Sequence, residues 1–384
     1  MTEPGESTGL WFGPWYRKSP FFDAARRAGF RAVDVYNKMY IPSHYVDDPA
    51  DEYWHLVDHV TMWDVGCERQ VEITGPDAFR FADYLTPRDL GTCAVGQGKY
   101  VVIVDGDGGI VNDPVLMRIA GDTFWLSTAD SDLLLWAKGV ALHLDHDVTI
   151  REPDVSPMQI QGPKAKDVVA ALAGPKVLDL PYYHFLETML DGIPVIITRT
   201  GWSAEVGFEI YLRDGTQGTR LWDLVAEAGR PFQIRPTGPV EARRIEAGIL
   251  NYPSDINLDV NPFEVGLGWL VDADKRADYV GKEALTRIRK EGAKRKLVGV
   301  EIHGEPFAGW VPEHWLVRKD REVVGRLTAG AYSPRLEKNI GYALVPIGLS
   351  KVGTRLVVET PMGDREATVV RKPFVDPTKA IPKG

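Results

Sequence analysis

The chain has 384 residues, of which 44% are hydrophobic and 26% charged, and its formal net charge at pH 7 is -9. This length predicts two or three domains rather than one core. The acidic balance argues against a surface for nucleic acid or an anionic membrane, so an anionic ligand would need a local cluster of Arg or Lys.

The N-terminal residues Met1 to Gly9 lack the basic and then apolar pattern of a signal peptide. No stretch of about 18 apolar residues follows, so we expect no membrane-spanning segment. The two cysteines, Cys67 and Cys93, form no CxxC motif and have no histidine cluster near them, which argues against a disulfide framework or a structural zinc site. The reducing cytoplasm is therefore the expected compartment.

A strand–helix pattern occurs twice. Residues 71–85 align without gaps on residues 158–172. Each copy has a short alternating strand, a glycine, a proline suited to the first helical position and an amphipathic helix. A weaker echo follows at residues 279–285. The repeat predicts two α+β halves packed against each other, although two Gly-Pro helix starts can also coincide by chance.

The turn at residues 105–114 carries the most distinctive polar pattern. It lies between two predicted strands, residues 100–104 and 115–119, and its glycines supply the positive φ angles of a tight hairpin. Asp113 stands where the second strand begins, and Pro114 restricts its backbone. A carboxylate held stiffly beside a sheet is a candidate site residue.

The same hairpin brings Lys99 and Tyr100 close to Asn112 and Asp113. An amine, a phenol, an amide and a carboxylate at one end of a hairpin make the first candidate site. The alternative interpretation is a polar hairpin end that stays solvated, which the turn alone favours.

The second candidate site lies on two predicted strands, residues 195–198 and 208–212, connected by a Gly-rich loop with Trp202. Glu209 and Tyr211 are two residues apart and therefore point to one face of the strand. An acid and a phenol below a tryptophan form a wall suited to a ligand. A solvent-facing pair of strand residues is the alternative.

Helices are predicted over residues 221–228, 239–250 and 282–289. In the second, apolar residues recur at helical spacing and Arg244 lies among the polar positions. Its guanidinium group suits an anionic ligand, which makes it the third candidate site. Ordinary helix surface is the alternative.

After the basic run 290–296, interpreted as a solvated linker, the pattern changes to short, alternating segments bounded by turns. It predicts a small all-β module, a barrel or a sandwich, over roughly residues 290–372. The predicted strands are residues 297–302, 315–319, 322–328, 340–345, 355–360 and 365–371.

A set of short motifs runs in a fixed order over residues 36–376. They are residues 100–115, which end in Asn-Asp-Pro-Val, and residues 130–139, 152–157, 161–165, 207–211, 244–250, 280–285, 328–334 and 338–343. This ordered set resembles the glycine cleavage T-protein (aminomethyltransferase) family. It is most similar to the dimethylsulfoniopropionate demethylase branch of that family.

The resemblance implies an α+β fold in which three domains form a ring, two α+β halves and a C-terminal all-β barrel. It also implies an entry segment packed on the folate-binding region. The expected division is 1–50 for this segment, 51–150 and 151–289 for the two halves, and 290–384 for the barrel module and tail. Tetrahydrofolate is expected in a central channel as the methyl acceptor, with no metal and no cobalamin.

The resemblance also assigns roles to the candidate residues. In the family, the acid at the position of Asp113 hydrogen-bonds the pterin and is required for activity, so Asp113 is the expected catalytic residue. The expected folate contacts are Tyr100, Asp113, Trp202, Glu209 and Arg244. The expected contacts with the methyl donor are Tyr36, Lys99, Trp202 and Tyr211.

The implied reaction is a demethylation, in which tetrahydrofolate takes a methyl group from a small donor and becomes 5-methyltetrahydrofolate. The donor is a sulfonium such as dimethylsulfoniopropionate, or an N-methyl or O-methyl compound. Three segments near the expected donor, residues 36–42, 202–206 and 252–256, depart from the demethylase pattern. The identity of the donor therefore stays open.

Two alternatives remain. An aminomethyltransferase of glycine cleavage would need a lipoyl carrier protein, and the Asn-Asp-Pro-Val text at residues 112–115 replaces its usual Asp-Asp-Leu. A non-catalytic folate-binding accessory protein of iron–sulfur assembly would carry a cysteine motif that residues 280–284 lack. The expected partners are tetrahydrofolate and a small donor, not nucleic acid, a membrane or a carrier protein, and a homodimer stays open.

Overall fold

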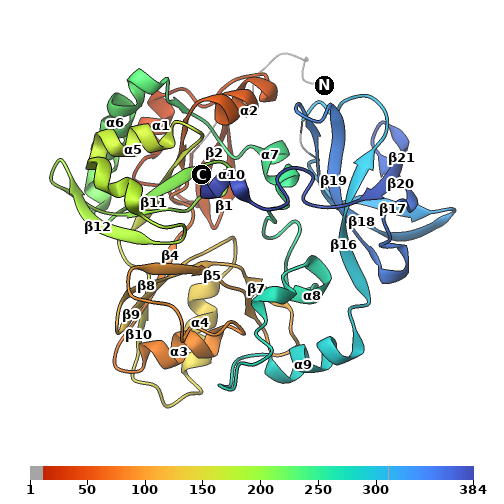
Figure 1. Ribbon diagram of the computed structural model, residues 1–384, viewed down its shortest axis with the longest axis horizontal. Coiled ribbons are helices and arrows are strands. Elements are labelled where there is room, and N and C mark those ends of the chain that lie inside the picture. Colours follow the sequence, from red (N-terminus) through yellow and green to blue (C-terminus); the bar gives the residue numbers. More distant parts are fainter. Residues whose placement is uncertain (1–11, 310) are drawn as a thin grey trace.

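The structure, a computed structural model, describes residues 12–309 and 311–384. The prediction about Met1 to Gly9 lies outside these residues. Figure 1 shows two α+β bodies and a β-barrel around a common centre, to which the C-terminal helix α10 returns. The expected α+β class with a C-terminal barrel is confirmed. Across the described residues, no helix is both long and apolar enough to cross a membrane.

A five-stranded antiparallel sheet forms the first body, in the order β10-β4-β9-β8-β5. Phe124 and Leu126 pack with Phe81 of α3 in one core, whereas Trp125 between them belongs to a different cluster. This alternation places the helices on one face of the sheet. The bounds are β4 Gln70–Thr74, α3 Ala78–Leu85, β5 Gln97–Tyr100, β8 Val115–Ala120, β9 Thr123–Ser127, α4 Leu133–Ala141 and β10 Thr149–Arg151.

A six-stranded sheet forms the second body, in the order β12-β13-β14-β11-β3-β15, and only β15 runs parallel to its neighbour among the described strands. Phe208 and Ile210 pack with the helices, so Glu209 and Tyr211 point the other way. The bounds are α1 Phe22–Arg27, β3 Thr61–Asp64, β11 Ser156–Gln161, α5 Ala165–Ala173, β12 Phe185–Leu190, β13 Ile193–Thr198, β14 Gly207–Leu212, α6 Gly218–Gly229 and β15 Arg235–Pro236.

The two sheets meet through the faces opposite their helices. Met117 and Trp125 of the five-stranded sheet share a buried cluster with Ile196 and Tyr211 of the six-stranded sheet. This contact brings polar residues at the ends of both sheets to the centre of the molecule.

The division expected at residue 150 does not follow the sheets. Strand β3 lies in the expected first half but joins the six-stranded sheet. Phe22 and Tyr40, from the expected entry segment, pack in the core of the same sheet. The remaining N-terminal elements are β1 Ala32–Tyr36, β2 Met39–His44 and α2 Pro49–Asp58. The two bodies are thus interleaved along the chain, because strand pairing joins segments far apart in sequence.

The repeated unit is confirmed as β4–α3 and β11–α5. Gly75 and Gly162 follow the two strands with φ angles of +129° and +124°. A Cβ atom at these positions would lie 2.5 Å from the backbone oxygen of Asp147 or of His59. Only glycine suits both this φ angle and this close approach.

The prolines after these glycines were expected at the first helical position. In both units the proline lies two residues before that position.

The hairpin that carries Asp113 is confirmed with one difference. Strand β6 (Ile103–Val104) pairs with β7 (Ile110–Asn112) in a small sheet of its own, separate from the β5–β8 pair. The predicted strand 100–104 is therefore interrupted after Tyr100. Asp113 lies in the matching interruption between β7 and β8.

The C-terminal strands close into a barrel in the order β16-β19-β18-β17-β20-β21. The barrel alternative is thus confirmed over the sandwich. The run 290–296, expected as a linker, is instead the end of α9 and the start of β16. The bounds are α7 Glu241–Glu246, α8 Pro262–Val265, α9 Lys282–Glu291, β16 Arg295–Ile302, β17 Trp315–Lys319, β18 Glu322–Ser333, β19 Lys338–Pro346, β20 Arg355–Thr360, β21 Gly363–Val370 and α10 Ala380–Lys383.

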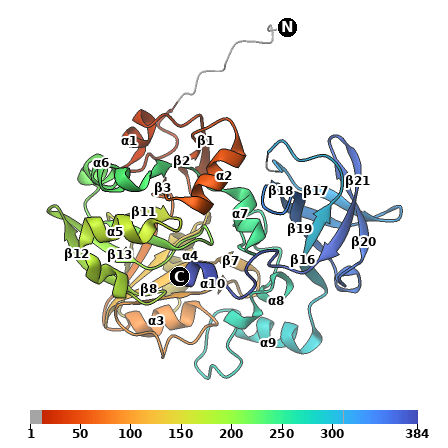
Figure 2. The same cartoon turned by 45° about the horizontal axis from the view of Figure 1, so that its top comes forward.

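Helix α7 is shorter than the predicted helix 239–250 and lies between the barrel and the six-stranded body (Figures 1 and 2). It ends before Gly248, whose φ of +74° is the left-handed conformation that glycine adopts after helices. Arg243 and Arg244 are both buried. The alternative of an ordinary helix surface is therefore wrong for Arg244.

Replacing Gly162 with alanine should destabilise the fold by about 1–3 kcal/mol, because the new Cβ would meet backbone atoms at a strained φ. Urea denaturation followed by circular dichroism measures the loss. Gly121→Ala is the matched control, since a Cβ there meets nothing within 4 Å. Equal stabilities of the two variants would contradict the role given to Gly162.

Candidate active site

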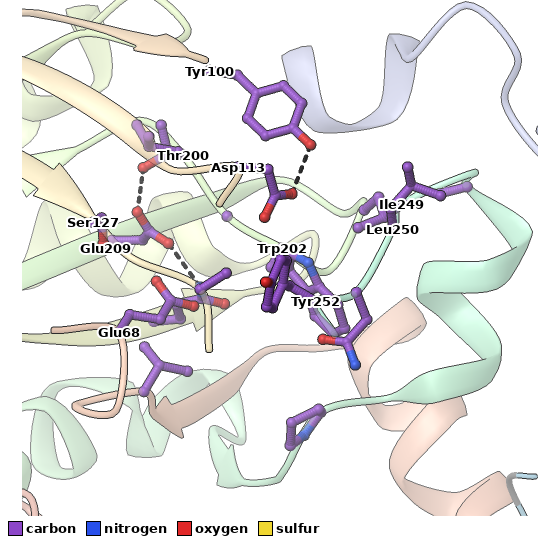
Figure 3. A pocket seen from close by; sticks show the side chains of 18 of the residues that line it. Glu68, Tyr100, Asp113, Ser127, Thr200, Trp202, Glu209, Ile249, Leu250 and Tyr252 are labelled. Atoms are coloured by element: carbon purple, nitrogen blue, oxygen red, sulfur yellow. Dashed lines mark hydrogen bonds between the residues drawn. The ribbon is translucent and has the colours of Figure 1, made fainter. Parts of the chain in front are cut away.

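A cavity of about 540 Å³ lies between the two α+β bodies (Figure 3). Its wall combines residues of both sheets, the loop after α7 and the C-terminal tail. Of the residues predicted from the sequence, those that line the cavity are Tyr36, Tyr100, Asp113, Trp202, Glu209 and Tyr211. Lys99 and Arg244 are not among the lining residues.

Asp113 faces the cavity from the join between β7 and β8. The phenol of Tyr100 donates a hydrogen bond of 2.8 Å to its Oδ2 atom (Figure 3). Burial raises the pKa of the Asp113 carboxyl to about 7, although the bond from Tyr100 opposes the shift. The neighbouring Asn112 anchors the segment through bonds to Ala129 O (3.0 Å) and Ser131 Oγ (2.7 Å). A carboxyl that titrates near neutral pH is thus fixed in the wall.

Glu209 reaches the cavity from β14. Its carboxylate accepts hydrogen bonds from Thr200 Oγ1 (2.6 Å), Gln159 Nε2 (2.7 Å) and Tyr211 OH (3.0 Å). Burial raises the pKa of Glu209, and these donors counteract the rise. Glu209 and Tyr211 are only 4% and 1% exposed, so the alternative of a solvent-facing pair is wrong.

Gln159 is a cavity residue that the sequence analysis missed. It lies on β11 directly opposite Glu209 of β14. Because its Nε2 donates to Glu209, its Oε1 is left as an acceptor, and this atom is buried without a partner in the described part of the chain. Its place in the repeated strand was the one sign in the sequence that could have pointed to Gln159. Only the pairing of β11 with β14 shows that Gln159 lies opposite Glu209.

Glu68 was also missed. It lies in the turn between β3 and β4 and lines the cavity. Its pKa is raised well above the ordinary value by burial and then by the charges of Glu209 and Asp113. Figure 3 shows Glu68 and Glu209 near Ser127, with Asp113 in another part of the wall. In the described residues, no group of three or more His, Cys, Asp or Glu side chains is placed to hold a metal ion.

Aromatic rings also line the cavity. Trp202 comes from the β13–β14 loop, Tyr252 from the loop after α7 and Tyr36 from the end of β1. The β1–β2 turn is fastened to the five-stranded body by Asn37, whose Nδ2 donates to Thr128 Oγ1 at 2.8 Å. Rings from three separate elements therefore line the same cavity as the polar groups.

Arg244 is occupied by other residues of the chain. Its Nε donates to Glu241 at 2.7 Å, and its Nη1 donates to Asp255 at 2.7 Å and to the carbonyl of Ile249 at 3.1 Å. Thr328 of the barrel in turn donates to Asp255 at 2.6 Å. Arg244 is thus bonded to the loop that lines the cavity, and its expected contact with a ligand stays a prediction.

Lys99 lies outside the cavity wall, because its Nζ donates to Thr92 Oγ1 at 2.6 Å and to the carbonyl of Asp89 at 3.2 Å. Lys372 and Lys379 of the C-terminal tail line the cavity instead. Burial lowers the pKa of Lys372 to about 8. The sequence analysis did not find these two lysines, because no motif or repeat lies in the tail. Their place in the wall depends on the return of the chain to the centre of the molecule.

Comparisons with known proteins agree along most of the chain. The family descriptions "GCVT N-terminal domain" and "Glycine cleavage T-protein C-terminal barrel domain" match residues 21–275 and 295–376. The chain is 38% identical to dimethylsulfoniopropionate demethylase DmdA of Ruegeria pomeroyi, over 92% of this chain and 96% of the relative. It is 31% and 32% identical to aminomethyltransferases of Alkaliphilus oremlandii and Thermotoga maritima, over 93% of this chain and 97% of each relative.

A solved structure shares the fold. Aminomethyltransferase T of the glycine cleavage system from Bartonella henselae superimposes with a TM-score of 0.84 at 23% identity, over 94% of this chain and 98% of that one.

Asp113→Asn should stabilise the fold above neutral pH. The pKa of Asp113 is about 7 in the folded protein against an ordinary value of 3.8, so between these values the folded state holds a proton that the unfolded state releases. Stability therefore falls as pH rises through this window, and asparagine removes this contribution. We expect a gain of about 1–2 kcal/mol at about pH 8 and none at about pH 4.

Urea denaturation over this pH range measures the difference. Asp107→Asn, at the exposed tip of the same hairpin, is the matched control. Parallel stability curves for wild type and Asp113→Asn would contradict the raised pKa.

Proposed function

This chain belongs to the glycine cleavage T-protein family, and we propose that it moves a methyl group from a small methylated donor to tetrahydrofolate, forming 5-methyltetrahydrofolate. Enzymes of this family transfer one-carbon units with tetrahydrofolate. The finer assignment to demethylation is supported by the relative with 38% identity, which is named a demethylase.

The wall of the cavity fits the pterin ring of tetrahydrofolate. The pyrimidine edge of a pterin carries N–H donors, and Gln159 Oε1 is a buried acceptor without a partner in the described residues. The carboxyl groups of Asp113 and Glu209 line the same cavity. Buried acceptors of this kind are satisfied by a ligand that donates to them. When bound, tetrahydrofolate supplies the N5 amine that accepts the methyl group.

The fixed carboxyl of Asp113 is the observation that carries the proposal. Because Tyr100 holds Oδ2 at 2.8 Å, the carboxyl keeps one orientation toward the cavity. A pKa of about 7 also suits it to accept the proton that a secondary amine releases after methylation. The cavity also increases the rate of methyl transfer by holding donor and acceptor close together and in line.

An aminomethyltransferase is the second candidate, favoured by relatives of that name with identities of 31% and 32%. It would need a lipoyl carrier protein, and the Asn-Asp-Pro-Val text at residues 112–115 argues against it. A non-catalytic folate-binding role is the third candidate. A cytoplasmic location and a homodimer stay predictions from the sequence.

Incubation with tetrahydrofolate and a panel of sulfonium, N-methyl and O-methyl donors tests the proposal. Mass spectrometry should detect 5-methyltetrahydrofolate with at least one donor. Asp113→Asn should lower the rate by about 100-fold or more, since the carboxyl acts on the reacting ring. Asp107→Asn, in the same hairpin, should keep the wild-type rate.

Two results would contradict the proposal. Full activity of Asp113→Asn would remove the role of its carboxyl. Formation of 5,10-methylenetetrahydrofolate with a lipoyl carrier protein, and of no 5-methyl product with any donor, would favour the aminomethyltransferase.

A further inference from the structure

The C-terminal tail, residues 371–384, leaves the barrel, runs to the centre of the molecule and forms part of the cavity wall (Figures 1 and 2). Its first segment is fixed to α7. The backbone N–H groups of Phe374 and Val375 both donate to the carbonyl of Glu246, at 2.8 and 2.9 Å. This part of the tail is therefore anchored where the helix ends.

The next segment is a turn in a conformation that L-amino acids rarely adopt. Asp376 and Lys379 have φ angles of +49° and +52°. The Asp376 carboxylate accepts hydrogen bonds from the backbone N–H groups of Ala380 at 2.9 Å and Ile381 at 2.8 Å. Strained residues of this kind persist only where neighbouring contacts hold them. The turn that these bonds hold places Lys379 in the wall of the cavity.

The last segment, helix α10, is bonded to the six-stranded body through Arg199. This arginine follows β13 directly, and its Nη2 atom donates to the carbonyls of Pro382 at 3.4 Å and Lys383 at 3.1 Å. Its guanidinium lies over the ring of Phe208, with 5.1 Å between Cζ and the ring centroid. Because a buried guanidinium needs acceptors, the tail satisfies Arg199 and Arg199 in turn holds the tail.

The attachment at Arg199 is weaker than the anchor at Glu246. The bonds from Arg199 are 3.1 and 3.4 Å long, whereas those to Glu246 are 2.8 and 2.9 Å long. Residues 377–380, between the two attachments, are exposed. A short segment with few buried contacts opens locally more readily than a core. Residues 376–384 can therefore move away from the wall while the anchored segment stays in place.

Resting on the function proposed above, we propose that residues 376–384 form a strap that closes the central cavity over a bound folate, and that Arg199 is the positioning residue that holds the strap shut. The strap carries Lys379. Burial, and then the charge of Lys383, lowers the pKa of Lys379, so this amine lacks a neighbouring negative charge. A negatively charged group of the ligand meets Lys379 only when the strap is shut, so binding favours the shut state.

The strap acts on the reaction through exchange of ligands. While it is shut, donor and acceptor stay together in one cavity, and its opening admits the substrates and releases the product. Loosening the strap therefore speeds both association and release. Loss of an ordinary contact in a fixed wall would speed release alone.

Stopped-flow binding of 5-methyltetrahydrofolate to the full chain, followed by the fluorescence of Trp202 and Trp269 in the wall, tests the strap. Arg199→Gln and Asp376→Ala each loosen it, so both should speed association and release by about tenfold. They change the net charge in opposite directions, so a shared effect is not electrostatic. Asp320→Ala alters an exposed aspartate with a φ of +56° in the β17–β18 turn and should keep the wild-type rates.

Hydrogen exchange of residues 376–384, measured by mass spectrometry, gives a second readout. In the wild type, bound folate should slow exchange of this segment. Without ligand, exchange there should be faster in both strap variants than in the wild type.

The outcomes separate this inference from the proposed function. If folate binds but a folded strap variant keeps the wild-type rates, or only its release rate rises, the strap is wrong and the proposed function stands. If the wild type does not bind folate, the proposed function fails and this inference fails with it. Should Arg199→Gln not fold, Asp376→Ala decides, because its carboxylate bonds to residues of the tail.

Discussion

The structure of this protein depends on three acidic side chains that share one cavity. No lysine or arginine of the described residues forms an ion pair with any of them. Glu68 comes from the turn after β3, Asp113 from the join of β7 and β8, and Glu209 from β14. Burial raises the pKa of each of them. Their desolvation works against folding, so the surrounding cores must offset it. Such a cost is expected where polar groups await a ligand rather than stabilise the fold.

Helix α7 is the element that joins the barrel to the six-stranded body beside this cavity. Glu246 accepts hydrogen bonds from Tyr53 of α2 at 2.8 Å and from Ser333 of the barrel at 2.5 Å. Arg243 donates to Glu205 of the β13–β14 loop at 2.7 Å. These partners come from three parts of the chain, so the charged residues of α7 act inside the molecule. A buried pair of this kind is sensitive to the loss of either partner, which makes α7 a positioning element.

Local patterns predicted much of the fold and part of the site. The repeated strand–helix unit, the barrel strands and the shared face of Glu209 and Tyr211 all follow from hydrophobic periodicity and glycine positions. Asp113 was found because glycines and a proline surround it. Glu68 and Gln159 were not found, because their neighbours depend on pairing between β3, β11 and β14, which lie far apart in sequence. Arg244 bonds to Glu241, Ile249 and Asp255, all within eleven residues along the chain, but helical spacing alone did not show that these groups are its partners.

A crystal structure of the protein with a bound reduced folate tests the central claim most directly. The account predicts the pterin ring in the central cavity, with its N–H groups within hydrogen-bond distance of the Asp113 carboxyl and of Gln159 Oε1. A pterin bound outside this cavity, with Asp113 in contact only with water and Tyr100, would contradict it.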